Sequence, residues 1–530
     1  MRDPMAFVFS PGDSREATAA WIQPYLNQAL EMLPDIMSSA GIKTRILQPG
    51  LVQTQAEAVR LARLVEYEMQ EGDILVPLCI GWGLPGISST LLSYLDGSLR
   101  HGHLKLLLLS NLLEQYPGYV QAAAIAQFAN ERLYHYQREI VTDWADKTVA
   151  DHLTQFRETG KISRPWDTHP PKICIDHTED DLGAVNQVVQ RLRGNIYAPV
   201  GGSSMLMRQG YAPLSLLADI GIGLQDIGMG ELRAAMDRIP NWRAEAAMKF
   251  CLSNGLKNIN VEENQFRRQM QLLLALYALR DHYGFTFGGI QGQFDLTSID
   301  VADDFATALM NSRCRPESNG KAMVWATEND AWGALTMLIM QLSVEARYGV
   351  ADDSVGFHDL RHIAPDYTNP AGSPGIVLLN SGALNLRDLT GCNDTMAGVR
   401  LESQDPGYFP NGGGCSAGEM VPTSKITYPG HVPDEAKVIT WARLMPNGPR
   451  ICLQAGHGEI ADISHEKRLE HYGKLDQQWP FGLLVPTGCD AMEILYEHVP
   501  NHTHTVPYDI LPVLSAVCWR LGWDFRGYGD

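Results

Sequence analysis

Apolar and polar positions follow two alternating patterns in the first third of the chain. Short apolar runs of strand length are separated by longer stretches in which apolar residues recur at helical spacing. The strand-like runs are AFVFS, TRILQ, ILVPLCIGW and LKLLLLS, and the helical stretches are WIQPYLNQALEMLPDIMSS and AEAVRLARLVEYEM. Strands that alternate with helices of this length predict βαβ units and a mainly parallel sheet.

The same style continues after a break. Prolines and charges in KISRPWDTHPPKICI indicate a linker, so we place a domain boundary near residue 170. The helical DDLGAVNQVVQRLRG and the strand-like NIYAPV follow, and ENQFRRQMQLLLALYALRDHYGF is the clearest helix of the chain. This helix leads into the glycine-rich loop FGGIQGQFDLT and then into a strand, AMVWA.

After about residue 350 the pattern changes to short strands and turns rich in Gly, Pro, Asn and Asp. We therefore predict an α/β protein with two N-terminal doubly wound α/β domains, which contain mainly parallel sheets, followed by a β-rich C-terminal domain. The predicted boundaries are 1–170, 171–348 and 349–530.

The junction WATENDAWGALTMLIMQ joins a strand-like run to an amphipathic helix. We predict Thr327 as the helix N-cap, with Asp330 at the capping-box position. Asp330 then has a structural explanation, as a residue that begins the helix. Glu328 is not needed for that purpose, and is either an acid stabilised by the helix dipole or a functional carboxylate.

The formal net charge of −19 limits the ligands to be expected. Binding to a phosphate backbone needs a surplus of Lys and Arg on one face, so we expect no nucleic-acid partner. The N-terminal apolar run is too short for a signal peptide, and the longest apolar stretches are interrupted by Pro and Gly. We expect a cytoplasmic protein without a membrane span, to which a divalent cation could bind.

Two later segments carry further ligand-type residues. GFHDLRH contains Asp359 between apolar neighbours, and HVPNHTHTVPYD contains His502 and His504. With Glu328, these residues supply the carboxylate and imidazole donors that Mn²⁺ and Mg²⁺ prefer and Co²⁺ tolerates. Local spacing leaves structural alternatives open, because Asp359 could pair with a nearby arginine and the histidines could lie in a solvated loop.

Taken together, an ordered set of segments over residues 200–520 resembles the L-fucose isomerase family of aldose–ketose isomerases. The set consists of GGIQGQ, ATEND, FHDLRH, LLNSGA, YFPNGGG, WP and NH. The resemblance implies a metal ion, typically Mn²⁺, bound by Glu328, Asp359 and His502, with His504 as the alternative histidine. It also implies a hexamer with shared active sites.

The resemblance further implies which side chains face the sugar. These are Gln291, Tyr408, Trp479, Asn501 and Trp82, of which the last is similar to a tryptophan that a neighbouring subunit contributes in the family. Moving a carbonyl from C1 to C2 requires proton transfer at carbon and oxygen, which carboxylates flanking a metal-bound diol perform through a cis-enediol. Glu328 and Asp359 are therefore the predicted catalytic residues.

The N-terminal opening SPGDSREA and the ending GWDFRGYGD depart from the family pattern, so the resemblance implies the reaction more strongly than the sugar. L-fucose or D-arabinose is one substrate, and a 6-modified hexose such as sulfoquinovose is another. An anionic tail would need a cation such as Arg15, Arg208 or Arg361. The alternatives are a catalytically silent carbohydrate-binding or regulatory homologue and a metal-dependent hydrolase.

Overall fold

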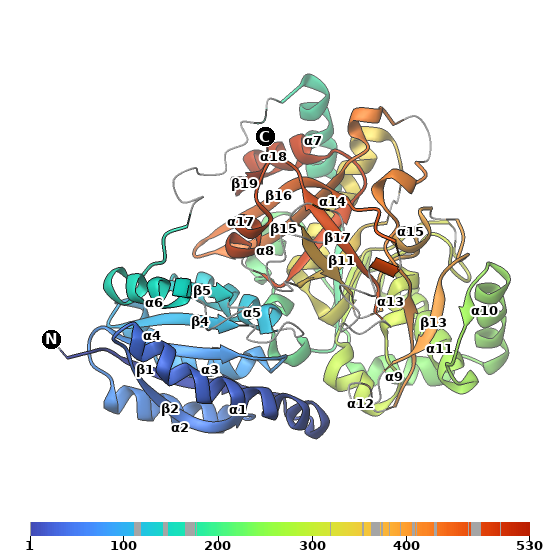
Figure 1. The fold of residues 1–530 in the computed structure, drawn as a ribbon. Helices are drawn as coiled ribbons and strands as arrows, with labels where there is room; N and C mark the ends of the chain where they lie inside the picture. The colour runs from blue at the N-terminus through green and yellow to red at the C-terminus, as the bar shows by residue number, and fades with distance from the viewer. Residues whose placement is uncertain are drawn as a thin grey trace.

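The computed structural model describes most of the chain (Figure 1). The described residues are 2–110, 118–140, 147–164, 175, 177–318, 320–351, 354–361, 372, 375–380, 382–392, 394–404, 409, 411–428, 432–464, 466–467, 479–498 and 500–529. The side chains of residues 359–361 lie outside the description, as does all of Tyr408.

The N-terminal part contains a five-stranded parallel sheet with the order β2-β1-β3-β4-β5, shown in blue to cyan in Figure 1. Its strands are β1 (Met5–Pro11), β2 (Lys43–Val52), β3 (Asp73–Cys79), β4 (Leu104–Ser110) and β5 (Tyr136–Ile140). Its helices are α1 (Glu16–Ser39), α2 (Gln55–Glu68), α3 (Pro85–Tyr94), α4 (Asp96–Arg100), α5 (Gly118–Glu131) and α6 (Lys147–Thr159).

Side chains of β1 alternate between two apolar layers, as the period of a strand requires. Ala6 and Val8 pack in one cluster with α1 and α6, whereas Phe7 and Phe9 pack in another with α2, α3 and α5. Helices therefore cover both faces of this sheet, which is the doubly wound arrangement that the sequence predicts.

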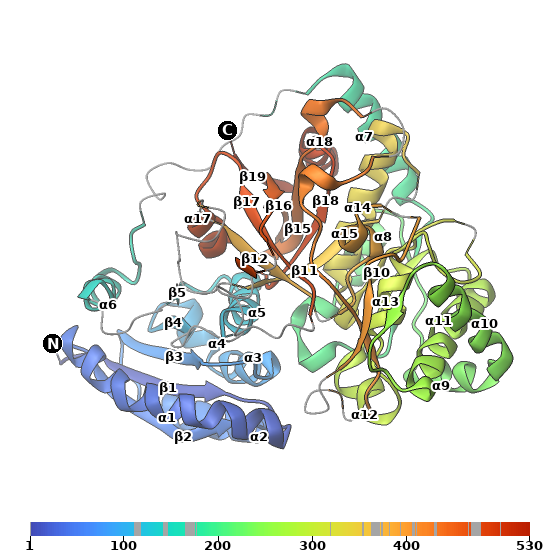
Figure 2. The same cartoon turned by 45° about the vertical axis from the view of Figure 1, so that its right-hand side comes forward.

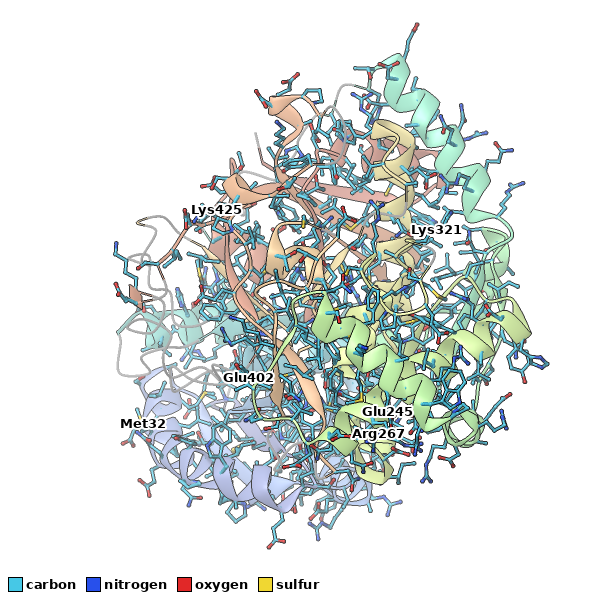
Figure 3. All side chains as sticks on the ribbon, turned by 90° about the vertical axis from the view of Figure 1, so that its right-hand side faces the viewer. Met32, Glu245, Arg267, Lys321, Glu402 and Lys425 are labelled. Carbon is cyan, nitrogen blue, oxygen red and sulfur yellow. The ribbon has the colours of Figure 1, made fainter. Side chains whose placement is uncertain are left out.

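A second parallel sheet has the order β10-β9-β6-β7. Its strands are β6 (Ile196–Val200), β7 (Gly223–Leu224), β9 (Phe287–Ile290) and β10 (Trp325–Ala326). The helices of this region are α7 (Glu179–Leu192), α8 (Leu214–Asp219), α9 (Met229–Arg238), α10 (Asn241–Ser253), α11 (Glu263–Tyr283), α12 (Thr297–Ile299), α13 (Asp304–Met310) and α14 (Ala331–Tyr348). Figure 3 shows α10 and α11 side by side, where Arg267 Nε lies 3.4 Å from Glu245 Oε1.

The C-terminal part is built on a seven-stranded sheet with the order β15-β18-β11-β12-β17-β16-β19, in which every neighbouring pair except β16 and β19 is antiparallel. Its strands are β11 (Gly356–Arg361), β12 (Ile376–Leu379), β15 (Ile439–Asn447), β16 (Arg450–Ile460), β17 (Phe481–Pro486), β18 (His502–Val506) and β19 (Asp524–Tyr528). Its helices are α15 (Leu386–Thr390), α17 (Ala491–Glu497) and α18 (Leu511–Leu521). A small sheet joins β8 (Lys257–Asn258), β13 (Arg400–Ser403) and β14 (Gly414–Ala417).

Helix α14 connects the second sheet to the C-terminal sheet. It begins directly after β10 and packs, with α7 and α18, in one apolar cluster with residues of β15 and β18. Figure 2 shows α14 beside the red C-terminal strands. The residues at the start of this helix are therefore close to both sheets.

These findings confirm the predicted fold class, with parallel α/β regions followed by a β-rich region. The three domain boundaries remain predictions, and residues 165–174 of the linker predicted near residue 170 lie outside the described residues. In the part of the chain that the structure describes, no helix is long and apolar enough to span a bilayer.

Candidate active site

The turn before α14 differs from the predicted helix start. Asp330, and not Thr327, is the N-cap of α14, because its Oδ1 accepts a hydrogen bond from the Gly333 amide at 2.8 Å. Thr327, Glu328 and Asn329 form a separate 3₁₀ turn that precedes the helix. A threonine hydroxyl at the start of this turn is too far along the chain to reach the helix amides that Asp330 caps.

Glu328 and Asn329 both adopt left-handed backbone conformations, with φ of 57° and 52°. Such conformations are costly for non-glycine residues and persist only where surrounding contacts fix them. Here the Asn329 amide donates to the carbonyls of Gly201 and Gly202 at 3.3 and 2.9 Å, and its Oδ1 accepts from the Tyr197 hydroxyl at 2.8 Å. The Glu328 carboxylate is therefore carried by a strained turn that is held in place.

Loops after three parallel strands meet at this turn. The Gln291 side chain, after β9, accepts from the Gly202 amide at 2.7 Å in the loop after β6. A Cβ atom at Gly289 would lie 3.1 Å from the Asn329 Cα atom, so a side chain at this position would crowd the turn after β10 where it approaches β9. Ligands of α/β proteins bind at such carboxyl ends of parallel strands.

His502, the first residue of β18, reaches this turn from the C-terminal sheet. Its Nε2 atom lies 3.2 Å from Glu328 Oε2, and its Nδ1 atom lies 2.7 Å from Asp330 Oδ2. The His502 and Asp330 side chains are buried, and 13% of the Glu328 side chain is exposed. Two residues that the sequence analysis selected, Glu328 and His502, therefore lie in contact although they are far apart in the chain.

Arg443 of β15 completes the surroundings of Asp330. Its guanidinium donates to both carboxylate oxygens of Asp330, at 2.5 and 3.1 Å, and both side chains are fully buried. Burial raises the pKa of Asp330, but the Arg443 charge and the His502 hydrogen bond outweigh burial and hold that pKa well below its usual range. Asp330 is therefore an anion within the protein interior.

His504 has a different environment from His502. Its Nε2 atom lies 3.2 Å from Arg443 Nη1, so that nitrogen accepts a hydrogen bond from the guanidinium and His504 is neutral. Burial, assisted by the Arg443 charge, lowers the pKa of His504 well below its usual value. The geometry favours His502 over His504 as the partner of Glu328.

Asp359 is brought close to His502 through its backbone. In the antiparallel pairing of β11 with β18, Asp359 is directly opposite His502. Its side chain lies outside the description, so the predicted set of Glu328, Asp359 and His502 is represented by two side chains and one backbone position. Among the described residues, no group of three or more His, Cys, Asp or Glu side chains has metal-binding geometry.

Asp303 is a buried carboxyl group that the sequence analysis did not select. Burial raises the pKa of Asp303 to about 6, and the negative charge of Glu328 adds to that increase. A Cβ atom at Gly292 would lie 2.0 Å from Asp303 Oδ1, so this carboxyl group packs directly against the QGQ loop. The region around Glu328 therefore contains more acidic groups than the motifs suggest.

The predicted sugar-facing residues have different positions. Trp479 donates from Nε1 to Gln404 Oε1 at 3.1 Å, Asn501 is buried next to His502, and Tyr408 lies outside the described residues. Trp82 is 9% exposed in this chain and its indole Nε1 lies 2.9 Å from Met205 Sδ, in the loop that also contacts Gln291. The subunit contribution of Trp82 remains a prediction.

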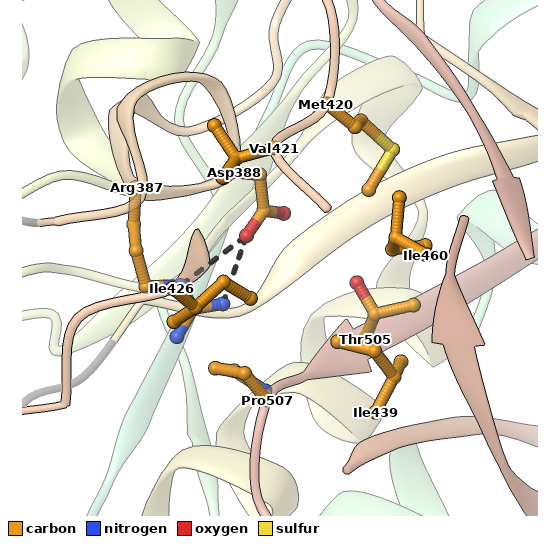
Figure 4. Close-up of a pocket in the computed structure, with 9 residues that line it drawn as sticks. All are labelled: Arg387, Asp388, Met420, Val421, Ile426, Ile439, Ile460, Thr505 and Pro507. Carbon is orange, nitrogen blue, oxygen red and sulfur yellow. Dashed lines mark hydrogen bonds and ion pairs between the residues drawn. The ribbon is translucent and has the colours of Figure 1, made fainter. Parts of the chain in front are cut away.

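A small pocket lies on the other side of the C-terminal sheet (Figure 4). It is lined by Thr505, which alternates with His502 and His504 along β18, and by the ion-paired Arg387 and Asp388. Its volume of about 10 Å³ accommodates no more than one water molecule. This pocket is therefore too small for a sugar and is not connected with the Glu328 turn by any shared residue.

Sequence reasoning also missed Arg443. It stands alone among apolar residues in ITWARLM, a segment that forms an almost entirely buried strand. Arginine is rarely buried unless it is paired, so an isolated arginine in an apolar strand predicts a buried acid opposite it. The sequence contains that signal but does not identify Asp330 as the partner.

The described donors fit a divalent cation in chemical type. The Glu328 carboxylate supplies an anionic oxygen, and His502 has its Nδ1 atom hydrogen-bonded to Asp330, which leaves Nε2 on the side of Glu328. Oxygen and imidazole donors of this kind suit Mn²⁺ and related ions, and a carboxylate behind a ligating histidine is the usual support of such a ligand.

Comparison with known proteins gives one family match. Residues 280–345 match the family model of the second N-terminal domain of L-fucose isomerase. The matched segment contains β9, the QGQ loop, β10, the Glu328 turn and most of α14. None of the curated proteins matches the chain. The family match confirms the resemblance to the L-fucose isomerase family over this segment of the chain.

Proposed function

We propose that the protein is a Mn²⁺-dependent aldose–ketose isomerase that acts on a free sugar or a 6-modified sugar through a cis-enediol. The observation that carries the proposal is the contact between Glu328, on a strained turn inside the family-matched segment, and His502, from a strand of another sheet. Backbone strain that is maintained by buried polar contacts is characteristic of functional sites.

The proposed metal ligands are Glu328, Asp359 and His502, with Mn²⁺ as the metal and Mg²⁺ or Co²⁺ as substitutes. When bound, the cation supplies Lewis acidity to the oxygens at C1 and C2 of the sugar. Glu328 and Asp359 are then the candidate groups that remove a proton from one carbon and return it to the other.

The surrounding residues have supporting roles in this proposal. Gln291 and Asn501 supply amide groups that hydrogen-bond to sugar hydroxyls, while Tyr408, Trp479 and the partner subunit's copy of the Trp82 segment enclose the sugar. Location in the cytoplasm and assembly as a hexamer are further expectations of the same proposal. L-fucose, D-arabinose and sulfoquinovose are the substrates to distinguish.

The test measures ketose formation by metal-stripped protein before and after Mn²⁺ is restored, with L-fucose, D-arabinose, L-rhamnose, D-glucose and sulfoquinovose. We expect turnover of one sugar that requires the metal and falls by about 10²–10⁴-fold in Glu328→Gln, which is the usual contribution of a general acid or base. Glu345→Gln is the matched control, because Glu345 lies near the other end of α14 and pairs with Arg191 at 2.7 Å.

The alternative is a catalytically silent carbohydrate-binding or regulatory homologue. Sugar binding without turnover in the wild-type protein, unchanged by Glu328→Gln, would support that alternative. Metal-dependent turnover that Glu328→Gln removes and Glu345→Gln retains would exclude it.

A further inference from the structure

The two carboxylate oxygens of Asp330 both accept from Arg443, but each has a further partner of its own. Oδ1 accepts from the Gly333 amide at 2.8 Å and so caps α14. Oδ2 lies 2.7 Å from His502 Nδ1 and 2.5 Å from Arg443 Nη1. The helix cap therefore uses one oxygen, and the other is directed at the histidine.

We propose that Asp330 is a positioning residue that acts through His502. Its Oδ2 accepts a hydrogen bond from His502 Nδ1–H, which favours the imidazole tautomer whose Nε2 lone pair faces Glu328 and the divalent cation. This inference rests on the proposed function, since the cation is part of it. It adds to that function a residue that does not itself contact the metal or the sugar.

A helix cap alone does not explain this arrangement. Serine or asparagine caps a helix as well as aspartate does, without a charge that must be neutralised in the interior. Here the charge is retained and a buried Arg443 is placed against it, although an ion pair of this kind contributes little net stability compared with apolar side chains of similar volume. The hydrogen bond between the Asp330 carboxylate and His502 Nδ1 gives a reason for the buried negative charge.

The histidine ring is also restricted by its neighbours. The Phe357 ring lies with its centroid 4.6 Å from that of His502 and 4.9 Å from that of His504. Arg443 contacts Asp330 and His504 at once, so the guanidinium fixes the carboxylate in the direction of His502. The position of the His502 ring is thus fixed before any ligand binds.

The variant Asp330→Asn tests this role. The introduced asparagine has one acceptor oxygen where Asp330 has two, so the anionic acceptor for His502 Nδ1 is lost, and either the Gly333 cap or any acceptor on the His502 side is lost with it. We expect Mn²⁺ affinity, measured by electron paramagnetic resonance on the full-length protein, to fall by about 10–100-fold.

Asp181→Asn is the matched control. Asp181 is also a buried carboxylate at a helix start, where it accepts from Thr178 and lies 3.2 Å from Arg347. Arg347 is near the C-terminal end of α14, which is about 27 Å long, so this change is remote from Glu328. The control should lose stability and retain Mn²⁺ affinity. Asp330→Ser, which caps the helix but is too short to reach His502, replaces Asp330→Asn if that variant does not fold.

A metal-free measurement separates this inference from the proposed function. The ¹⁵N shifts of the His502 imidazole, measured at a pH where the ring is neutral and assigned by comparison with His502→Gln, should show the Nδ1-protonated tautomer in the wild-type protein and a larger share of the Nε2-protonated tautomer in Asp330→Asn. If wild-type protein binds no Mn²⁺ but shows this change, the proposed function fails and the positioning role stands. An Nε2-protonated tautomer in the wild-type protein, or equal Mn²⁺ affinity in wild type and Asp330→Asn, would overturn the positioning role.

Discussion

The two parallel sheets share a topology class but differ in what holds them together. The first has strands of five to ten residues whose side chains pack into two apolar layers. The second has strands of two to five residues, and polar contacts of Asn329 and Gln291 join the loops that follow them. The longer sheet is a scaffold, whereas the shorter one holds the candidate active site.

Backbone strain follows the same division. Among the described residues, six non-glycine residues have positive φ, and four of them, Met205, Leu206, Glu328 and Asn329, come after β6 and β10 of the second sheet. Regular strands that satisfy their own hydrogen bonds do not place a carboxylate at an unusual angle, but a strained turn fixed by side chains does. The difference indicates that the turns after the short strands of the second sheet are irregular because they orient the Glu328 carboxylate.

The largest effect should come from the core of the first sheet. Leu75 of β3 is fully buried, so Leu75→Ala should lower the free energy of unfolding by about 2–5 kcal/mol. Denaturant titration measures this loss, and the kcat and KM of the protein that remains folded should not change. A large fall in kcat of the folded protein would show that the first sheet contributes more than a scaffold.

Asn329→Ala tests the second sheet. The change removes the hydrogen bonds to Gly201, Gly202 and Tyr197, leaves the buried Tyr197 hydroxyl unpaired, and should lower stability by about 1–3 kcal/mol. Here kcat should also fall, because the Glu328 turn loses its support. The control is Asn254→Ala, which removes an amide contact to Phe250 O at the end of α10 and should leave kcat unchanged.

The contact between the first sheet and the C-terminal part of the chain includes Arg138 and His498, the C-cap residue of α17. Arg138 of β5 donates to the His498 carbonyl at 3.1 Å, and burial, together with the charges of Arg443 and Arg138, lowers the pKa of His498 to about 3. The unfolded chain therefore binds a proton below pH 6.5 that the folded chain does not, so stability is lost as the pH falls.

Replacing this histidine should remove that dependence. Between pH 7 and pH 5, wild type should lose about 2 kcal/mol of stability relative to His498→Gln, since each pH unit below the unfolded pKa contributes about 1.4 kcal/mol. Unfolding curves of both proteins at the two pH values measure the difference. Parallel pH profiles would mean that His498 is protonated in the folded protein.

The smallest effect should come from a helix cap in the first region. Thr54 accepts from the Glu57 amide at 3.2 Å in a capping box at the start of α2, so Thr54→Ala should cost about 1 kcal/mol. A thermal melt measures it, and kcat/KM should equal that of wild type. Any change in kcat/KM from this exposed cap would weaken the distinction between the two sheets.

Local pattern was sufficient for the helices and strands of the regular regions. The apolar runs in β1, β3 and β4 and the periodic stretch in α11 are long enough for burial to dominate, so the predicted elements agree with the observed ones to within a few residues. The start of α14 was predicted wrongly, because Thr327 and Asp330 are both good caps locally and only the backbone of the turn distinguishes them.

The sequence by itself determined the alternation of parallel α/β and β-rich regions, the acidic character of the chain, and the family to which residues 280–345 point. These depend on short-range periodicity and on motifs whose order along the chain is visible. Only the tertiary structure showed that Glu328 contacts His502 and that His504 is hydrogen-bonded to Arg443. It also showed that Asp330 caps α14 and hydrogen-bonds to His502. Such contacts join residues that are far apart in the chain. Which residues meet depends on how the second sheet and the C-terminal sheet pack at the start of α14, and a local sequence pattern contains no information about that packing.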